Sequence, residues 1–475
     1  MITQTERNYL LLLQLKYIDY SIAMKKLLFT SLMIFFIGFA VSALSFSGKW
    51  EGTLKAGLVK LRLVFNIQES QDGTLSATLD SPNQGATDIP CDATRVPGND
   101  KIEINVPLYH AKFTGALNNG KIEGTFSQNG LNLPLTMEKV EKENSNPDLP
   151  QETSNQESYD YLFKHDGVTL AGQLDMPPAS FSRPCPAVIL ISGSGTQDRD
   201  EALLGLKPFK VISDYLTSHG IAVFRYDDRG AGESSPLNGN ETTLDFAKDA
   251  QAAFDLVCDQ YEMIDPTCIG YIGHSEGGQI AFVNAASDKR VAFVVSLAGP
   301  AASGRDVMVK QNLSLLDMMG VPYTQSQVDE VSAIFDDIVN IADTVALRES
   351  LRKRLTASTL QHYTDEQIEQ NVAAMTSPWY ITYIRFNPKP YLEKITCPVL
   401  ALNGEWDFQV DAKQTLDALK TSVKNVQCKL LPKHNHLFQE CASKFESMNY
   451  ATQGNISSIT LDYIKDFIKC VNSKQ

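Results

Sequence analysis

A serine stands among closely spaced glycines in the stretch Gly273–Gly278, which reads Gly-His-Ser-Glu-Gly-Gly. No other Gly-x-Ser-x-Gly pattern occurs in the chain; this one follows the apolar run Ile269–Ile272 and precedes a helix-compatible run, Gln279–Ala286. A nucleophilic serine in a tight strand-to-helix turn needs glycines on both sides, because flanking side chains would clash there. The start of the following helix favours developing negative charge. The spacing therefore predicts that Ser275 is a nucleophile.

A serine hydroxyl is a poor nucleophile until a base takes its proton. Where the nucleophile sits in such a turn, the chain order is serine, acid, histidine. Three histidines follow Ser275: His362, His434 and His436. His362 lies in a long helical stretch, whereas the other two follow the apolar run Lys429–Leu431. We predict that His436 is the base, with His434 as the alternative.

The acid that orients this histidine should follow the apolar strand Val399–Asn403. Glu405, Asp407 and Asp411 all lie just beyond that strand. Asp411 is placed to cap the next helix, so we predict Asp407 as the acid and keep Glu405 as the remaining option. The task of this acid is to fix the histidine tautomer and to stabilise the imidazolium.

Negative charge on the substrate oxygen needs two backbone N–H donors, one of them from the residue after the nucleophile, Glu276. The second should come from the loop Ile191–Asp200, whose small residues let the backbone approach a substrate, and Ser194 is the predicted donor. A phosphate-binding loop is disfavoured, because this loop has no lysine and lacks Gly-x-Gly-x-x-Gly spacing. His274 adjoins the nucleophile and is expected to pack beside it.

Six apolar strands and several amphipathic helices should position these residues. The expected strands are Ala187–Ser192, Ile221–Tyr226, Ile269–Ile272, Val291–Leu297, Val399–Asn403 and Lys429–Leu431. The expected helices between them include residues 208–218, 243–261 and 411–420. This alternation predicts an α/β fold with a mostly parallel sheet covered on both faces. Residues 301–390 show only helical periodicity and are expected to form a cap over the edge where ligands of such sheets bind.

The chain before this region follows a different pattern. Residues 46–140 alternate apolar and polar residues between Gly, Asn and Asp turns, which predicts hairpins in a small antiparallel barrel or sandwich. We expect this β domain to span residues 44–140, a polar linker to span 141–158, and the catalytic domain to span 159–475. Trp50, near the start of the β domain, is expected to plug a barrel end.

The N-terminus carries the parts of a secretory signal. Met24 is followed by two lysines, then by the apolar run Leu27–Ala43, which ends in small residues. We expect translation to begin at Met24 and cleavage to follow Ala43, so that residues 1–23 are an upstream extension. The expected location is periplasmic or secreted, without a stable membrane anchor. An uncleaved anchor helix is the competing interpretation.

Composition narrows the class of protein. The 475 residues are 43% hydrophobic and 21% charged, which is typical of globular domains. A formal net charge of −14 without a basic stripe argues against nucleic acid as a partner. Among eight cysteines, Cys258–Cys268 and Cys428–Cys441 are candidate disulfides. Cys185 and Cys397 are better explained as small buried hydrophobic residues.

Five stretches together resemble the α/β-hydrolase superfamily over residues 159–475. They are Gly193–Asp200, Tyr226–Ser234, Gly273–Gly278, Leu402–Val410 and Asn435–Gln439. The chain looks most like the secreted bacterial serine esterases that join a small β domain to the hydrolase core. The resemblance implies cleavage of a small-molecule or glycan-linked ester through an acyl-enzyme, without metal or organic cofactor. It also implies that Asp228 and Arg229 are scaffold, while Ser192 stands where relatives usually carry histidine.

Two other functions stay open. The same residues could cleave amides, as in peptidases related to prolyl oligopeptidase, although the chain lacks the long propeller of those enzymes. The protein could also be an inactive binding protein whose β domain holds a glycan or lipid; the intact triad argues against this. Trp379, Tyr380 and Tyr383 are the cap aromatics that could line a substrate pocket or simply pack within the cap.

Overall fold

A computed structural model of the chain describes most of both predicted domains. The described residues are 46–56, 59–69, 74–81, 86–96, 101–107, 111–118, 120–128, 131–139, 157–318, 320–360, 363–450 and 453–472. The predicted signal segment (1–43), most of the predicted linker and His362 lie outside them. The chain divides into two compact units, which are described separately.

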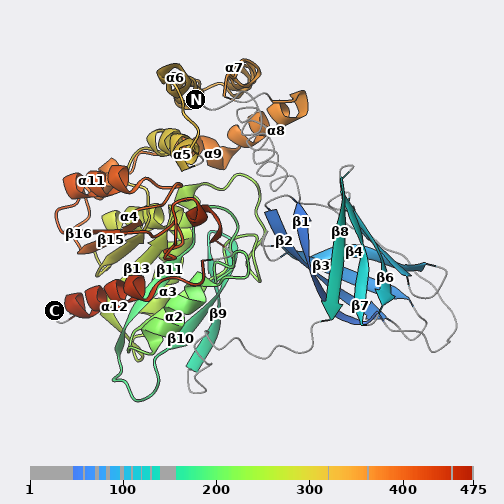
Figure 1. The fold of residues 1–475 in the computed structure, drawn as a ribbon. Coiled ribbons are helices and arrows are strands. Elements are labelled where there is room, and N and C mark those ends of the chain that lie inside the picture. The colour runs from blue at the N-terminus through green and yellow to red at the C-terminus, as the bar shows by residue number, and fades with distance from the viewer. Residues whose placement is uncertain are drawn as a thin grey trace. The chain divides into compact units, whose positions relative to one another are not determined.

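The first unit is a closed antiparallel barrel (Figure 1). Its strands are β1 (Gly48–Ala56), β2 (Val59–Glu69), β3 (Leu75–Ser81), β4 (Ala86–Val96), β5 (Lys101–Val106), β6 (Ala111–Asn118), β7 (Lys121–Gln128) and β8 (Leu131–Lys139). Each strand pairs with the next, and β8 pairs back with β1, so the sheet has no open edge. The prediction of a small antiparallel barrel or sandwich is confirmed as a barrel.

Alternation along the strands fills this barrel with apolar side chains. Along β6, buried residues alternate with exposed or half-buried ones, as expected when successive side chains point to opposite faces. Phe65 and Phe113 stack inside with ring centroids 5.9 Å apart. Trp50 is 2% exposed, and its indole N–H donates to the carbonyl of Phe46 at 2.7 Å. The indole therefore lies in the core with its polar atom satisfied.

The second unit is built on an eight-stranded sheet in the order β16-β15-β14-β13-β11-β12-β10-β9. The strands are β9 (Glu157–His165), β10 (Val168–Met176), β11 (Cys185–Ile191), β12 (Ala222–Tyr226), β13 (Ile264–His274), β14 (Val294–Leu297), β15 (Val399–Gly404) and β16 (Val426–Leu431). From β12 to β16 neighbouring strands are parallel. The predicted mostly parallel sheet is confirmed.

The antiparallel hairpin β9–β10 was not anticipated. β10 pairs antiparallel with β9 on one side and with β12 on the other. β9 forms the edge of the sheet, and most of its side chains are exposed or half-buried. An edge strand of this kind has no continuous apolar run, so the strand pattern used for the core did not detect it.

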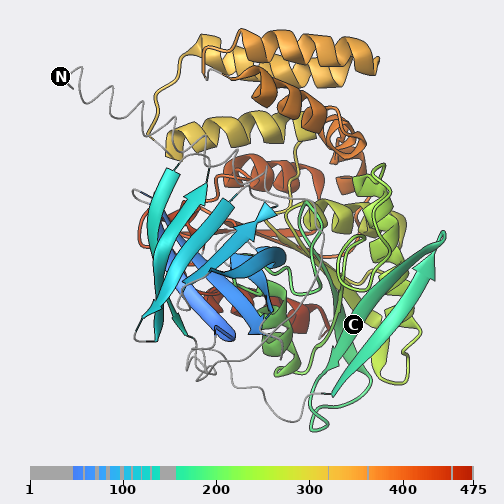
Figure 2. The ribbon, with the colours of Figure 1, turned by 90° about the vertical axis from the view of Figure 1, so that its right-hand side faces the viewer.

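Helices cover both faces of the sheet (Figures 1 and 2). They are α2 (Pro208–Thr217), α3 (Thr243–Cys258), α4 (Glu276–Ser287), α10 (Lys389–Leu392), α11 (Ala412–Ser422) and α12 (Ser458–Asn472), with a short 3-10 turn at Glu446–Met448. Two apolar cores result. Along β11, Ile189 packs with α3 and α4, whereas its neighbours Val188 and Leu190 pack with α2 and α12.

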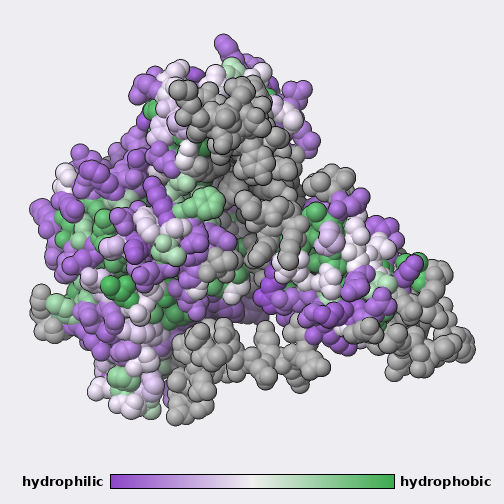
Figure 3. Space-filling model, viewed as in Figure 1, coloured by the Kyte–Doolittle hydropathy of each residue, from purple (hydrophilic) through white to green (hydrophobic). Residues whose placement is uncertain are grey.

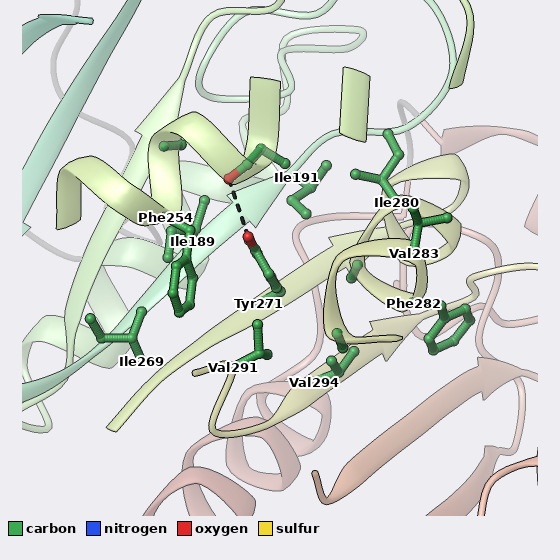
Figure 4. Close-up of a cluster of buried hydrophobic side chains, with 14 of the residues drawn as sticks. Ile189, Ile191, Phe254, Ile269, Tyr271, Ile280, Phe282, Val283, Val291 and Val294 are labelled. Atoms are coloured by element: carbon green, nitrogen blue, oxygen red, sulfur yellow. Dashed lines mark hydrogen bonds between the residues drawn. The ribbon is translucent and has the colours of Figure 1, made fainter. Parts of the chain in front are cut away.

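Figure 4 shows part of the core beneath α3 and α4, where isoleucine and valine side chains surround Tyr271. The Tyr271 hydroxyl donates to the carbonyl of Ala250 in α3 at 3.2 Å, so this buried polar group is satisfied. Cys185 lies in the same core and Cys397 packs against it partly buried, in agreement with their interpretation as small hydrophobic residues.

Between β14 and α10, the described residues form five helices without an intervening strand. They are α5 (Gly304–Met318), α6 (Gln325–Asn340), α7 (Thr344–Thr356), α8 (Asp365–Met375) and α9 (Pro378–Arg385). Thr324 and Thr364 begin α6 and α8 with capping boxes, which satisfy the first free N–H groups of each helix. The five helices share their own apolar cluster and gather on one side of the sheet (Figures 1 and 2). We refer to α5–α9 as the cap.

Both predicted disulfides are wrong. Cys258, Cys428 and Cys441 carry free thiols, so neither the Cys258–Cys268 nor the Cys428–Cys441 bond forms. The Cys428 sulfur lies 3.7 Å from the carbonyl of Leu416 in α11, whereas Cys441 turns toward a carbonyl of its own loop. Short separation in sequence therefore did not bring these sulfur atoms together. Burial raises the pKa of Cys258 and of Cys441 to about 11.

The visible surface of the second unit is mainly hydrophilic, with scattered hydrophobic residues (Figure 3). Within the described ranges, no helix combines the length and apolarity required to span a bilayer.

Candidate active site

Ser275 occupies the turn between β13 and α4. Its φ of 52° and ψ of −121° are unusual for a residue with a side chain, and such conformations persist only where the surroundings enforce them. A Cβ on Gly273 would lie 2.1 Å from the carbonyl oxygen of Gly277, and one on Gly277 would lie 2.1 Å from that of Ile191. Both glycines are therefore required by space, which is the physical basis of the pattern recognised in the sequence.

The topology brings the predicted loops to one edge of the sheet. Ser275 follows β13, Ser194 follows β11, Asp407 follows β15 and His436 follows β16. All four strands are parallel, so their carboxyl ends share an edge, where open α/β sheets bind ligands.

Asp407 and His436 are directly paired. The Nδ1 atom of His436 lies 2.7 Å from Oδ2 of Asp407, and both side chains are buried. The other carboxylate oxygen, Oδ1, accepts the backbone N–H groups of Gln409 at 2.8 Å and Val410 at 2.9 Å. These two donors fix the carboxylate, which in turn fixes the imidazole with Nδ1 protonated and Nε2 available as a base.

The alternative residues have other partners. Asp411 caps α11 by accepting the N–H of Gln414 at 2.8 Å. Glu405 is exposed and accepts the backbone N–H of Lys433 at 3.0 Å. His434 is held between the carbonyl of Pro432 and the hydroxyl of Ser457, each at 2.7 Å. The structure thus joins Asp407 to His436 and assigns these three side chains to loop and helix structure.

The loop with the second predicted oxyanion donor lies beside Ser275. A Cβ on Gly193 would lie 3.2 Å from the Cβ of Ser275. The N–H of Gly193 donates to Oε1 of Glu201 at 2.7 Å and is therefore engaged, which leaves the next N–H, that of Ser194, as the candidate. The N–H of Glu276 opens α4, where the first amides of a helix have no partner within the helix.

Asp228 anchors this loop. Its carboxylate accepts the Ser192 hydroxyl at 2.8 Å and the Gln197 N–H at 3.0 Å. Burial raises the pKa of Asp228 well above its ordinary value, against the effect of these hydrogen bonds. Ser192 therefore holds the loop through its side chain. Arg229 forms an ion pair with Asp249 at 2.7 Å.

Glu276 links the nucleophile turn to the cap. Its buried Oε1 atom accepts the Thr243 hydroxyl at 2.5 Å and the Trp379 indole N–H at 3.0 Å. Burial raises the pKa of Glu276, against the opposing effect of the Thr243, Trp379 and Ser194 side chains. One side chain thus connects α3 to α9 of the cap.

The cap aromatics lie together on α9. Trp379 stacks on Tyr383 with centroids 5.4 Å apart, and Tyr380 meets Trp379 edge-on at 6.0 Å. Tyr383 is buried, whereas Trp379 and Tyr380 are half-buried. Trp379 is therefore the one of the three that both contacts the nucleophile turn and keeps part of its surface accessible.

Glu201 was not among the residues predicted for the site, and His274 had no predicted partner. Nδ1 of His274 lies 2.8 Å from Oε1 of Glu201, and its Nε2 lies 3.0 Å from the carbonyl oxygen of His436. Glu201 directly follows the matched stretch Gly193–Asp200, so an acidic residue at the end of that loop was the available signal. Nothing local connects it to His274, 73 residues away.

Comparison with known proteins agrees with the topology of the second unit. A family model described as serine aminopeptidase, S33, of the Hydrolase_4 type, matches residues 207–440. The esterase EstD of Thermotoga maritima is 26% identical over 298 residues, which are 62% of this chain and 64% of EstD. The second unit has the α/β-hydrolase fold. The chain spans less than two thirds of the length of this curated relative.

Two solved structures similar to this α/β-hydrolase cover nearly the whole of their own chains. The α/β-hydrolase GrgF from Penicillium sp. sh18 is 17% identical, with a TM-score of 0.43, over 66% of this chain and 98% of its own. Est1E from Butyrivibrio proteoclasticus, solved with ferulic acid bound, is 18% identical, with a TM-score of 0.42, over 66% of this chain and 99% of its own.

Proposed function

We propose that this α/β-hydrolase cleaves carboxylic esters, either small molecules or glycan-linked esters, through a covalent acyl-enzyme. The observation that carries the proposal is the buried Asp407–His436 pair at 2.7 Å, at the same sheet edge as the strained turn of Ser275. The similarity to the esterase EstD supports an ester as the substrate.

In the proposed reaction, the Ser275 hydroxyl oxygen attacks the acyl carbon while Nε2 of His436 takes the hydroxyl proton. The oxyanion accepts the N–H groups of Glu276 and Ser194. The alcohol leaves with the proton from His436, and a water molecule then attacks the acyl-enzyme with His436 again acting as base. Asp407 stabilises the imidazolium formed in each half-reaction, and the acid product leaves with Ser275 restored.

The test is labelling with a fluorophosphonate followed by peptide mapping, alongside turnover of p-nitrophenyl esters with acyl chains from C2 to C12. Modification confined to Ser275, together with ester turnover, is expected. The chain-length profile would then measure the depth of the acyl site. Folded protein that neither reacts at Ser275 nor turns over esters would overturn the proposal and favour a binding protein.

A second candidate is cleavage of amides, which the description of the matching family model as a serine aminopeptidase favours. The two activities share the attack by Ser275 and differ in the leaving group, because an amine must be protonated as it departs. Turnover of aminoacyl anilides exceeding that of matched nitrophenyl esters would make the chain a peptidase. The reverse ratio is expected.

We also propose that the protein is exported, since Leu27–Ala43 has the composition of a signal segment. N-terminal sequencing of the protein from its native host tests this proposal. A mature chain beginning at Leu44 is expected, and one that retains residues 24–43 would contradict it.

A further inference from the structure

His274, the residue before the nucleophile, has a hydrogen-bond acceptor at each ring nitrogen. Nε2 faces the backbone carbonyl of His436 at 3.0 Å, and a carbonyl can only accept, so Nε2 carries a proton. Nδ1 faces Oε1 of Glu201 at 2.8 Å. The same oxygen accepts the N–H of Gly193 at 2.7 Å, which favours the ionised carboxylate and places a second proton on Nδ1.

This pair is enclosed by protein. His274 is 6% exposed and Glu201 is 5% exposed. Burial opposes the charged form of His274, but the Glu201 carboxylate and the His436 carbonyl together raise the pKa of His274 above its ordinary value. Asp407 adds to this effect, and the His436 ring lies 4.7 Å away between centroids. Glu201, Asp407 and His436 are the titratable groups that face His274.

The backbone of Glu201 is held in an uncommon conformation, with a φ of 51°. Its N–H donates to the carbonyl of Asp198 at 2.9 Å, while the Asp198 carboxylate accepts the N–H groups of Asp200 and Ala202. A non-glycine residue persists in this region of φ when its surroundings over-determine it, and such residues concentrate at functional sites. The turn places the Glu201 carboxylate where one of its oxygens contacts both the Gly193 N–H and the His274 ring.

We infer that Glu201 and His274 are positioning residues that form a buried ion pair joining the oxyanion loop to the loop of the catalytic histidine. The connection runs from the Gly193 N–H to Glu201, then to His274 and to the His436 carbonyl. It passes beside Ser275, since a Cβ on Gly193 would lie 3.5 Å from Nδ1 of His274 and 3.2 Å from the Ser275 Cβ. This role rests on the proposed function, because it aligns the donors and the base of that reaction.

The pair makes the alignment dependent on pH. Because the pKa of His274 is raised, the stabilisation of the folded protein by the Glu201–His274 ion pair is fully present below the ordinary histidine pKa of about 6.5. It is lost as the pH rises through the raised value. A neutral imidazole has one N–H, so it can hold either Glu201 or the His436 carbonyl but not both. We therefore expect kcat to fall on the alkaline side of its pH profile.

The protonation state of His274 can be read without measuring turnover. In protein labelled with ¹⁵N-histidine, the His274 resonances are assigned by their loss in His274→Gln. In a pH titration, the form of His274 with protons on both ring nitrogens is expected to persist to a higher pH in the wild-type protein than in Glu201→Gln. A wild-type His274 that loses its second ring proton at or below the ordinary histidine pKa of about 6.5 would overturn the inference.

Kinetics test the positioning role. Glu201→Gln keeps the size of the side chain but removes the charge. The resulting misalignment of the oxyanion donors and the base is expected to lower kcat about 10- to 100-fold. KM should stay within about twofold, since uniform binding is untouched. The alkaline limb of the profile should move to lower pH, which a merely structural change would not cause.

Glu405→Gln is the matched control, because the exposed Glu405 carboxylate also accepts a backbone N–H, that of Lys433. It should leave both kcat and the alkaline limb unchanged. If Glu201→Gln has the wild-type kcat and the alkaline limb of its pH profile does not move, the inference is overturned. The proposed function would still stand in that case, provided that fluorophosphonate labels Ser275. If Ser275 does not react, the proposed function fails, and the ¹⁵N measurement still decides whether the ion pair exists.

Discussion

The barrel and the α/β-hydrolase domain bury different kinds of side chain. Among the barrel residues whose burial is described, Ser81 is the single buried polar one, and the rest of this buried set is apolar apart from glycine. The described part of the hydrolase domain buries many charged and polar residues, and those at the site lie at or just beyond the carboxyl ends of the parallel strands. His274, Glu276, Asp407 and His436 are among them.

Burying a charge without a partner costs much more than burying an apolar group gains. The hydrolase domain meets this cost with specific hydrogen bonds, such as the two backbone N–H groups on Asp407. The barrel avoids this cost because apolar and polar residues alternate along its strands, so that the polar side chains point outward. A substitution in the barrel should therefore change stability, whereas one in the loops should change catalysis.

The largest effect should follow Ser275→Ala, which removes the attacking oxygen. Turnover of p-nitrophenyl acetate is expected to fall about 10⁴-fold or more. Thermal unfolding should be almost unaffected, because the strained turn is held by the surrounding glycines rather than by the hydroxyl. Substantial turnover in the purified variant would show that the strained turn serves another purpose.

Asp407→Asn should come next, with a loss of about 10³- to 10⁴-fold in kcat, since an amide no longer fixes the His436 tautomer. Asp411→Asn is the matched control four residues along the same loop. Asparagine caps a helix about as well as aspartate, so its kcat and Tm should match the wild type. Equal losses in the two variants would refute the distinction between orienting acid and helix cap.

Trp379→Phe should have a smaller effect at the cap. It preserves an aromatic ring against Tyr383 but removes the indole donor to the buried Glu276 carboxyl. Losing one hydrogen bond to a buried acceptor costs about 1–3 kcal/mol. We expect kcat/KM for esters to fall several-fold as the cap loosens over the nucleophile turn. Unchanged steady-state kinetics would mean that this contact has no part in catalysis.

The same substitution in the barrel, Trp50→Phe, should have the smallest effect on activity. It removes a more deeply buried indole hydrogen bond, that to the Phe46 carbonyl. We expect about 1–2 kcal/mol of destabilisation in the unfolding transition of the barrel and no change in kcat/KM. Calorimetry resolves the transitions, and a parallel loss of ester turnover would show that the barrel takes part in catalysis.

Local patterns predicted most of the framework. Period-two alternation was enough for the barrel, and continuous apolar runs located six parallel strands, because both patterns reflect burial along a single element. The edge strand β9 was missed because its side chains are largely exposed. The disulfides were wrong for a related reason, since closeness in sequence says nothing about where two side chains point.

Part of the candidate site also follows from the sequence alone. The glycines around Ser275 are dictated by contacts of the turn with nearby backbone, and the order serine, acid, histidine follows the order of the strands. These features depend on residues close together in the chain or on strand ends that a parallel sheet must bring to one edge.

Tertiary structure alone decided which side chains meet. His434 and His436 lie two residues apart in similar surroundings, and left-handed backbone at Lys433 and Phe438, with φ of 59° and 58°, belongs to the loop that aims them differently. The Glu276–Trp379 contact and the Glu201–His274 pair span 103 and 73 residues. Such pairings depend on how separate loops converge over the sheet, and no periodicity within a single element records that convergence.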